Sequence, residues 1–369
     1  MVGAGPAGAT AALNLAPTRS VLLTDWRDLR SDSPSVGESL APAARRLFDD
    51  MGILDSFLTE DHLPWYGNRS VWGAHTVAEG DLLRDLDGHG WHLDRANFDN
   101  WLRATAMNRG TTLLPKAQLQ AVEPLTTGRG WLVSLSTGTR GRVQFCARVL
   151  IDASGRFASL ARRLGARQQS LEERLVCAWV NGLAPRETSG TAGFTLLEAV
   201  EDGWWYSAPL PQGRRTLAFH TDPGLTATAL ARSTESLVLH AARATVLASL
   251  LDECKFSANS GRVRLTVANG GRLSPPAGPG WFSAGDAAVH FDPLSSQGLL
   301  NALFTGLATA EASDRLLEGE EPKPVAESYK SMIANIWKLY LSHRQAWYHE
   351  ENRWPEAPFW SRRHRSGTP

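Results

Sequence analysis

The amino-acid sequence is short of cysteine, of lysine and of long apolar runs, and each shortage excludes a class of protein. Its three cysteines (Cys146, Cys177 and Cys254) are far apart and include no CxxC pair. This argues against a disulfide framework or a cysteine-rich metal site, so we expect a cytoplasmic protein without a bound metal. No stretch approaches the roughly 20 apolar residues of a membrane-spanning helix, so we expect no membrane partner.

Charge is balanced. The chain has 38 Lys plus Arg against 38 Asp plus Glu, so nothing in its electrostatics favours nucleic acid as a partner. Lysine is scarce, and none precedes Lys116. Tryptophan, by contrast, is abundant at 14 residues, which suits core filling as well as an aromatic ligand or an apolar interface.

A glycine-rich turn opens the chain. Gly3, Gly5 and Gly8, with Ala7 between them, have the spacing of a dinucleotide-binding fingerprint and precede a helix expected over Ala9 to Leu15. The N-terminus of such a helix offers free N–H groups and a positive dipole end to a phosphate. An incidental glycine-rich turn would have the same letters, so this motif needs support from elsewhere.

Asp25 supplies part of that support. It closes the next expected strand, Val21 to Asp25, at the distance from the glycines where an acid accepts hydrogen bonds from ribose hydroxyls. A surface carboxylate at a strand end is the alternative. Because Val2 alone is left of the strand that should precede the turn, we also expect the sequence to lack a few N-terminal residues.

A second motif lies near the other end of the chain, at Gly280–Ala288 and Asp292–Asn301. It resembles the second FAD-binding signature of the aromatic-hydroxylase flavoproteins. The resemblance implies that Gly285 and Asp286 contact the ribityl–pyrophosphate part of FAD. It also implies that Pro293, Gly298 and Leu299 lie beside the isoalloxazine ring, where the start of a helix expected over Gln297 to Leu317 would face the N1–C2=O edge.

Three further segments fit the same resemblance. His92–Asp99 is similar to the segment that carries an arginine near the flavin, here Arg95, and Val36–Pro42 is similar to the Gly-Glu loop, which implies roles for Glu38 and Ser39. Leu150–Arg162 is similar to a segment that bears an Asp-Gly pair in NAD(P)H-dependent hydroxylases, but Ser154 stands at the aspartate's place. The electron donor, NAD(P)H or a separate flavin reductase, therefore stays open.

Together these motifs resemble the FAD-dependent aromatic hydroxylase and tryptophan halogenase superfamily. The resemblance implies an α/β (α+β) fold in which a Rossmann-like FAD-binding domain of the glutathione-reductase type is interleaved with an antiparallel-sheet substrate domain. We expect the FAD-binding domain over 1–70, 95–170 and 260–318, the substrate domain over 71–94 and 171–259, and a C-terminal helical tail over 319–369. The basic run Arg362–Arg365 reads as a solvated end of that tail.

Tryptophan halogenases carry a lysine soon after the Gly-Glu loop and a Trp-x-Trp-x-Ile-Pro strand. This chain has no early lysine and reads Gly203–Pro209 at the strand position, which argues against halogenation. The Trp204–Tyr206 part of that strand fits a pocket wall and a half-buried sheet equally well.

Segments 62–73, 88–95 and 351–360 resemble the tryptophylquinone-maturation flavin monooxygenases, the QhpG and LodB/GoxB type. The resemblance implies hydroxylation of a tryptophan side chain in a polypeptide, the small subunit of a quinoprotein dehydrogenase or oxidase, on the way to cysteine tryptophylquinone. FAD, O2 and an electron donor would act through a flavin hydroperoxide, and other maturation proteins would be partners. The alternatives are a flavin-dependent halogenase or hydroxylase of a small aromatic molecule, and a binding protein without chemistry.

Acid and base groups for that chemistry are expected around the flavin. His290 and Asp292 precede Pro293, and Glu38, His89 and His92 lie in the loops expected opposite; of these, His290, Asp292, Glu38 and His92 are our candidate catalytic residues. Imidazole suits such a task because its pKa lies near working pH. A hydrogen-bonded structural histidine is the commoner finding for any single one of them.

Overall fold

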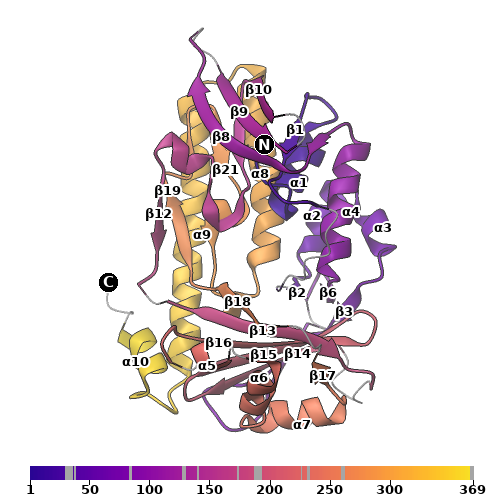
Figure 1. Ribbon diagram of the computed structural model, residues 1–369, viewed down its shortest axis with the longest axis vertical. Coiled ribbons are helices and arrows are strands. Elements are labelled where there is room, and N and C mark those ends of the chain that lie inside the picture. The colour runs from indigo at the N-terminus through magenta and orange to yellow at the C-terminus, as the bar shows by residue number, and fades with distance from the viewer. Residues whose placement is uncertain are drawn as a thin grey trace.

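The computed structural model describes residues 1–29, 36, 39–82, 85–126, 130–138, 141–172, 174–186, 193–225, 227–230, 233–258 and 262–365. The chain forms two lobes that are joined along one side by a long helix (Figure 1). The predicted gross architecture, a dinucleotide fold interleaved with an antiparallel sheet, is confirmed.

A mainly parallel sheet lies at the centre of the first lobe. Its members are β7 (Thr112–Leu114), β1 (Leu22–Thr24), the single residue Val2, β11 (Leu150–Asp152), β21 (Trp281–Ser283) and the antiparallel edge β20 (Ala277–Gly278). Val2 forms parallel bridges to both Thr24 and Asp152 and so joins the two halves of the sheet. The residue before the glycine turn thus occupies the central strand position that the fingerprint requires.

Helices pack against this sheet because their small residues allow close approach. The helices of this lobe are α1 (Pro6–Leu15), α2 (Ala44–Asp50), α3 (Leu54–Leu58), α4 (Arg95–Asn108), α8 (Gly298–Glu318) and α9 (Pro322–Glu350). On α1, Ala9, Ala11 and Ala12 are almost fully buried, and a Cβ on Gly306 of α8 would lie 2.6 Å from the Ala7 carbonyl oxygen. The close contact between α1 and α8 therefore depends on the absence of a side chain at Gly306.

Three small sheets complete the first lobe. They are formed by β8 (Ala117–Pro124), β9 (Trp131–Thr137) and β10 (Gly141–Ala147); by β12 (Arg167–Ser170), β19 (Gly271–Ser274) and β22 (Val289–His290); and by β2 (Ser39–Leu40), β6 (Gly90–His92) and β3 (Leu63–Trp65). Short 3-10 turns connect these elements at η1 (Gly155–Phe157), η2 (Ala161–Leu164), η3 (Gly285–Ala287) and η4 (Pro293–Ser295).

The second lobe is built on an eight-stranded sheet. Its path runs β17 (Ser257–Ala258), β13 (Val176–Leu183), β16 (Arg214–Thr221), β15 (Gly203–Leu210), β14 (Phe194–Val200), β4 (Gly67–Val71) and β5 (Ala78–Asp81), and β18 (Arg264–Val267) pairs with the first half of β13. Trp205, Leu217 and Phe219 pack in one cluster with residues of α6 (Thr234–Ala241) and α7 (Thr245–Glu253). The short α5 (Ala227–Leu230) precedes these two helices. The opposite face, with Trp204 and Tyr206, is turned toward the first lobe (Figure 1).

Element boundaries agree closely with the sequence patterns. The helix expected over Arg95 to Asn108 is α4, and Asp94 caps it by accepting hydrogen bonds from the N–H groups of Ala96 (3.1 Å) and Asn97 (3.2 Å). The helix expected over Gln297 to Leu317 is α8, one residue later at each end. The predicted domain limits remain a prediction. Residues 67–70 and 264–267, which were expected in the FAD-binding domain, belong to β4 and β18 and so to the sheet of the second lobe.

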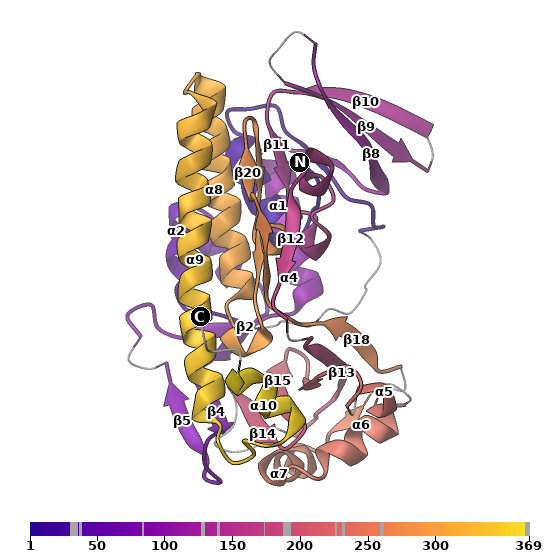
Figure 2. The ribbon, with the colours of Figure 1, turned by 90° about the vertical axis from the view of Figure 1, so that its left-hand side faces the viewer.

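The C-terminal segment does not end as a solvated tail. The long α9 runs beside α8 and reaches the second lobe, where α10 (Pro358–Arg365) folds back against it (Figure 2). The Arg363 side chain is fully buried and pairs with Asp222 at 2.7 Å. The expectation of a solvated basic run is therefore wrong for Arg363, because a buried carboxylate from β16's end neutralises it.

Candidate functional site

A cavity of about 1260 Å³ lies between the lobes. It exceeds the usual range of about 300–1,000 Å³ for a small-molecule pocket, so it has room for a dinucleotide and a substrate. Its wall includes eleven of the residues expected to bind the cofactor: Gly3, Gly5, Ala7, Asp25, Ser39, Arg95, Gly285, Asp286, Pro293, Gly298 and Leu299. Gly8 is not in the wall, and Glu38 lies outside the described residues.

The three glycines of the first turn meet different constraints. Gly3 has φ +103°, and a Cβ there would lie 2.1 Å from the Ala153 carbonyl oxygen, while a Cβ on Gly8 would lie 1.9 Å from the Gly3 oxygen. A Cβ on Gly5 would meet no protein atom within 4 Å. Gly3 and Gly8 are therefore required by packing, whereas Gly5 leaves open space at the cavity wall where a ligand can approach the backbone.

Two helices begin at this cavity. Gly5 precedes α1 and Gln297 precedes α8, and neither helix has a side-chain cap at its N-terminus. A Cβ on Gly298, the first residue of α8, would also meet nothing within 4 Å. Uncapped N–H groups and the positive ends of two helix dipoles thus face a common space, an arrangement that suits a pyrophosphate and an anionic ring edge.

Gly285 joins the two motifs. Its φ is +57°, its N–H donates to Thr305 Oγ1 at 2.8 Å, and a Cβ on it would lie 2.9 Å from the Ala7 Cβ. Next to it, Asp286 pairs with Arg156 at 3.2 Å. The chain's first and last glycine motifs are therefore in direct contact, and the residues present fit a bound dinucleotide.

Asp25 is buried at the end of β1. Its Oδ2 accepts from the Ala4 N–H at 2.9 Å, and Arg27 binds both carboxylate oxygens at 3.0 and 2.9 Å. Burial acts to raise the pKa of Asp25, but the hydrogen bonds from Arg27 and Ala4 outweigh it and hold the pKa below the usual value. The carboxylate is thus an ionised acceptor, as a ribose contact requires.

Among the candidate catalytic residues, Asp292 alone of those described lines the cavity. It is 2% exposed, its Oδ2 accepts from the Tyr348 hydroxyl at 2.7 Å, and its N–H donates to the Tyr340 hydroxyl at 3.0 Å. Burial raises the pKa of Asp292, and the hydrogen bond from Tyr348 opposes that rise. Asp292 is therefore a carboxyl group tuned toward its protonated form.

The candidate histidines predicted from the sequence do not line the cavity. His290 sits 3.1 Å from Gln168 Nε2, and burial, then Arg156, lowers its pKa to about 4. His92 is fully buried, 3.5 Å from Ser39 Oγ, and burial, then Arg215, lowers its pKa to about 3. His89 is half-buried and its Nδ1 is 2.7 Å from the Gly90 oxygen. Burial thus keeps His92 and His290 neutral, and neither reaches the cavity directly.

Ser154 has a structural partner. Its N–H and hydroxyl both donate to Asp152 Oδ1, at 2.9 and 2.6 Å, and its oxygen accepts from the Ser159 N–H at 2.7 Å. The departure from the Asp-Gly pattern therefore stabilises the turn after β11, at a place that also lines the cavity.

The far end of the cavity is closed by side chains of the eight-stranded sheet: Cys177, Tyr206, His220, Thr266 and, just after β18, Ala268. The Tyr206 hydroxyl is 3.0 Å from Ser39 Oγ, which also lines the cavity. Sequence reasoning left the place of Tyr206 open and missed Cys177, His220 and Thr266. The only sequence signal for these residues is the alternation of side chains along each strand. The register that aligns β13, β15, β16 and β18 joins segments distant in sequence, so no local pattern predicts that they meet.

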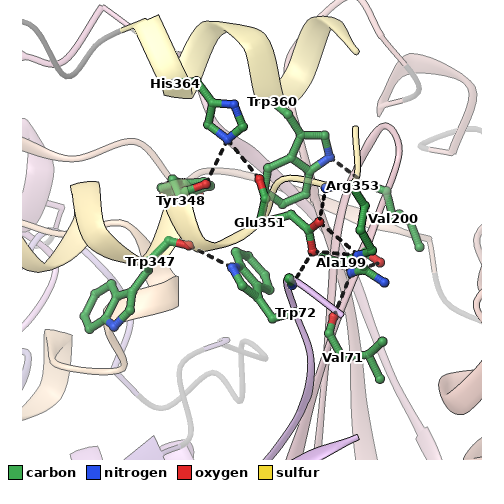
Figure 3. Close-up of polar contacts among 11 residues, drawn as sticks. Val71, Trp72, Ala199, Val200, Trp347, Tyr348, Glu351, Arg353, Trp360 and His364 are labelled. Carbon is green, nitrogen blue, oxygen red and sulfur yellow. Dashed lines mark hydrogen bonds and ion pairs between the residues drawn. The ribbon is translucent and has the colours of Figure 1, made fainter. Parts of the chain in front are cut away.

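The C-terminal segment, here called the C-terminal cap, packs against the ends of β4 and β14 (Figure 3). Glu351 is fully buried, accepts from the Gly73 N–H at 2.8 Å and pairs with Arg353. Two indoles donate to backbone oxygens: Trp72 Nε1 to Trp347 (2.8 Å) and Trp360 Nε1 to Val200 (2.9 Å). In addition, His364 Nε2 lies within hydrogen-bond distance of the backbone oxygens of Tyr348 (3.0 Å) and Glu351 (2.9 Å). Because the Tyr348 hydroxyl also donates to Asp292, the C-terminal cap connects the ends of these strands with the cavity.

A glycine-built dinucleotide cradle that opens onto an antiparallel sheet defines the class of two-lobed FAD-binding oxidoreductases. Within that class, the chain belongs to the tryptophan halogenase family, whose model matches residues 83–369. FAD is accordingly its cofactor, and the superfamily expected from the motifs is confirmed.

Individual relatives differ in their described activities. The FAD-dependent oxidoreductase LodB of Marinomonas mediterranea is 27% identical over 99% of this chain and 96% of LodB. The myxobacterial chondrochloren halogenase CndH has a TM-score of 0.89 at 21% identity, covering 98% of this chain and 84% of CndH. QhpG, a peptidyl tryptophan dihydroxylase essential for tryptophylquinone cofactor biogenesis, has a TM-score of 0.75 at 22% identity, covering 98% of this chain and 77% of QhpG. At these identities the two structures indicate a shared fold and no more.

In the described parts of the chain, no helix is both long and apolar enough to cross a membrane. The same residues contain no group of three or more His, Cys, Asp or Glu side chains that could hold a metal ion.

Proposed function

We propose that this protein is an FAD-dependent monooxygenase that hydroxylates a tryptophan side chain of a polypeptide during biogenesis of a tryptophylquinone cofactor. The observation that carries the proposal is the chemistry of the cavity wall. All five lysines lie in described parts of the chain, and none of them lines the cavity; Lys116, the first, is half exposed and pairs with Asp28 at 2.7 Å. The amine that halogenation would require is thus missing from the wall.

Exposed apolar residues in the cavity wall favour a large substrate. Three apolar residues of the wall are strongly exposed: Trp26 (64%), Phe157 (71%) and Val267 (59%). Exposed apolar groups are typical of a surface that another molecule covers. A polypeptide substrate, such as the small subunit of a quinoprotein dehydrogenase or oxidase, would cover such residues, and the similarity to QhpG, a peptidyl tryptophan dihydroxylase, supports a peptidyl substrate.

The proposed roles follow from position. The open backbone at Gly5 and the start of α1 would bind the FAD pyrophosphate, Asp25 the ribose, and the start of α8 with Pro293 and Leu299 the ring. Reduced FAD supplies the electrons that activate O2. Asp292, held by Tyr348, would exchange a proton at its carboxyl group, and the apolar sheet end would exclude water from the reacting carbon.

The overall reaction balances as follows: one aromatic C–H, O2, two electrons and two protons give one C–OH and one water. The electrons come from NAD(P)H or from a separate flavin reductase. Since Ser154 is committed to Asp152, we favour the separate reductase. No disulfide joins the described residues Cys146, Cys177 and Cys254, which is in keeping with the cytoplasm as the place of reaction, with other maturation proteins at hand.

The test is direct. The purified holoprotein is incubated with a reductant, isotopically labelled O2 and a small-subunit peptide that contains tryptophan, and the peptide is analysed by mass spectrometry. We expect a gain of one or two labelled oxygen atoms on tryptophan, and no gain in a peptide whose tryptophan is replaced by phenylalanine. A competent peptide that gains no oxygen would contradict the proposal.

A second candidate is a flavin-dependent halogenase or hydroxylase of a small aromatic molecule. Membership of the tryptophan halogenase family and the high structural similarity to CndH favour it. Product halogenation that depends on chloride or bromide, or turnover of a free phenol or indole in place of the peptide, would establish this candidate instead.

A further inference from the structure

The wall of the cavity at the sheet end contains a cross-strand row of side chains. Trp204 on β15 pairs with His220 on β16, His220 pairs with Cys177 on β13, and Cys177 pairs with Thr266 on β18. Side chains of directly opposed residues lie on the same face of a sheet and contact each other. Cys177, His220 and Thr266 all line the cavity, so this row forms its floor.

His220 is held rigidly in that row. Its ring stacks on the Trp204 indole, with centroids 3.7 Å apart and an interplanar angle of 7°, and the residue is 2% exposed. Burial lowers the pKa of His220 to about 3, and a hydrogen bond with the Trp204 backbone opposes the shift. The imidazole is therefore neutral at working pH and has one N–H donor and one acceptor nitrogen.

One nitrogen of this ring lacks a hydrogen-bond partner within the described protein. His220 Nδ1 is buried and has no hydrogen-bond partner among the described residues. Most buried polar atoms have a partner, and one without a partner calls for an explanation such as a catalytic role or a bound water or ion. A fully buried imidazole at a cavity floor with a spare nitrogen is thus prepared for a polar atom that enters with the substrate.

The surroundings define which ligand fits. The other sheet residues at this end, Cys177, Tyr206, Thr266 and Ala268, have no charged side chain at neutral pH, and Phe291 adds an apolar ring. Such a site takes a flat, apolar molecule with one hydrogen-bond donor, and an indole has that chemistry.

We propose that His220 is the specificity-determining residue for the substrate, and that its imidazole accepts a hydrogen bond from the indole N–H of the tryptophan to be hydroxylated. The proposal rests on the function proposed above. Trp204 acts through His220 as a positioning residue, since its stacked ring fixes the plane of the imidazole.

A double-mutant cycle tests the proposed contact. On the protein side, His220→Phe keeps a flat ring against Trp204 and removes both nitrogens. On the substrate side, 3-benzothienylalanine replaces tryptophan in the peptide, so that sulfur stands where the N–H was. The dissociation constants of the four pairs are measured with oxidised holoprotein by calorimetry, which needs no turnover.

We expect the wild type to bind the benzothienyl peptide about fivefold more weakly than the tryptophan peptide, and His220→Phe to bind both peptides with equal, weakened affinity. The control Cys177→Ala, on the neighbouring strand of the same row, should retain the wild-type preference for tryptophan. If His220 had only a structural role, His220→Phe would weaken the binding of both peptides by the same factor and leave the preference for tryptophan intact. This result would overturn the proposal. Flavin content of each variant, read from its absorbance, confirms that the cofactor site is unaffected.

Failure of the two proposals can be told apart. If the wild type oxygenates the tryptophan peptide and the preference survives in His220→Phe, the function stands and the role of His220 is wrong. If the wild type neither binds nor oxygenates any tryptophan peptide, both are wrong.

Discussion

The two ends of the cavity are built from different parts of the polypeptide. At the cofactor end, the wall offers the backbone of two glycine motifs and two uncapped helix N-termini, together with side chains such as those of Asp25, Arg95 and Asp286. At the sheet end, the wall includes side chains that the strands β13, β15, β16 and β18 bring together, with Tyr206 and His220 at its floor. The backbone end can bind the same cofactor throughout a family, whereas the side-chain end can change with the substrate.

The largest expected effect separates two glycines of the same turn. Gly3→Ala should cost roughly 4 kcal/mol or more of folding free energy, because a Cβ would lie 2.1 Å from the Ala153 oxygen at a φ of +103°. Gly5→Ala should leave the melting temperature almost unchanged and weaken FAD binding about tenfold or more, because its methyl group projects where the pyrophosphate approaches. Thermal unfolding of the apoprotein and fluorescence titration with FAD measure the two effects.

If Gly5→Ala bound FAD as the wild type does, the pyrophosphate would not lie against this turn, and the description of the cofactor end as a backbone cradle would be wrong. Gly298→Ala at the start of α8 is the matched variant, since a Cβ there also meets no protein atom within 4 Å.

The next effect concerns the cap at the sheet end. Arg363→Ala leaves the buried Asp222 carboxylate with its partly exposed second partner, Arg362, and should cost about 3–5 kcal/mol of unfolding free energy. Arg69→Ala, which removes the far more exposed pair with Glu79, should cost less than about 1 kcal/mol. Urea denaturation measures both; similar losses would mean that the cap adds little to the stability of the second lobe.

Acid should destabilise the side-chain end. The pKa values of His92 and His220 are lowered to about 3, below the ordinary histidine value of about 6.5 in the unfolded chain. The unfolded state therefore binds more protons between these values, and the unfolding free energy falls as the pH falls from 7 toward 3. From pH 7 to pH 5 the loss is roughly 2 kcal/mol per histidine. Denaturation at both pH values measures this loss. In His92→Gln the loss of unfolding free energy between pH 7 and pH 5 should be smaller by the amount due to one histidine. An unchanged loss in that variant would contradict this explanation.

The same contrast explains what the sequence could predict. Gly3, Gly5, Gly8 and the Gly285-Asp286 motif act through local backbone geometry, which a short motif specifies. His220 and Cys177 lie 43 residues apart in sequence and meet only through strand register, which no local pattern fixes. Their place at the cavity floor could not be read from the chain.

Arg363 and the histidines show the limit of composition. A run of basic residues near the chain end reads as solvated, yet Arg363 is buried because Asp222, which is distant in sequence, faces it. His290 and His92 have the right residue type and the right segments, but burial places both behind the wall and lowers their pKa values. Residue types that can act as acids or bases therefore predicted where the site lies. They did not predict which of these residues faces the cavity.

The smallest effect concerns the link between the two ends, Tyr348 and Asp292. Tyr348→Phe removes the hydroxyl that donates to Asp292 Oδ2 at 2.7 Å and should cost about 1–2 kcal/mol at neutral pH. Burial already raises the pKa of Asp292, and without this hydrogen bond the pKa rises further. Where the pH lies between the unfolded and folded pKa values, the folded protein holds more protons, so the unfolding free energy falls as the pH rises.

The variant should therefore approach wild-type stability near pH 4 and diverge from it as the pH increases. Tyr340→Phe is the matched control: the Tyr340 hydroxyl accepts from the Asp292 N–H at 3.0 Å, so its loss should cost stability by a similar amount at every pH. Denaturation curves of both variants across this range separate the two. Parallel behaviour of the two variants would mean that Tyr348 does not act on the Asp292 carboxyl group, and that the C-terminal cap stabilises the sheet without tuning the site.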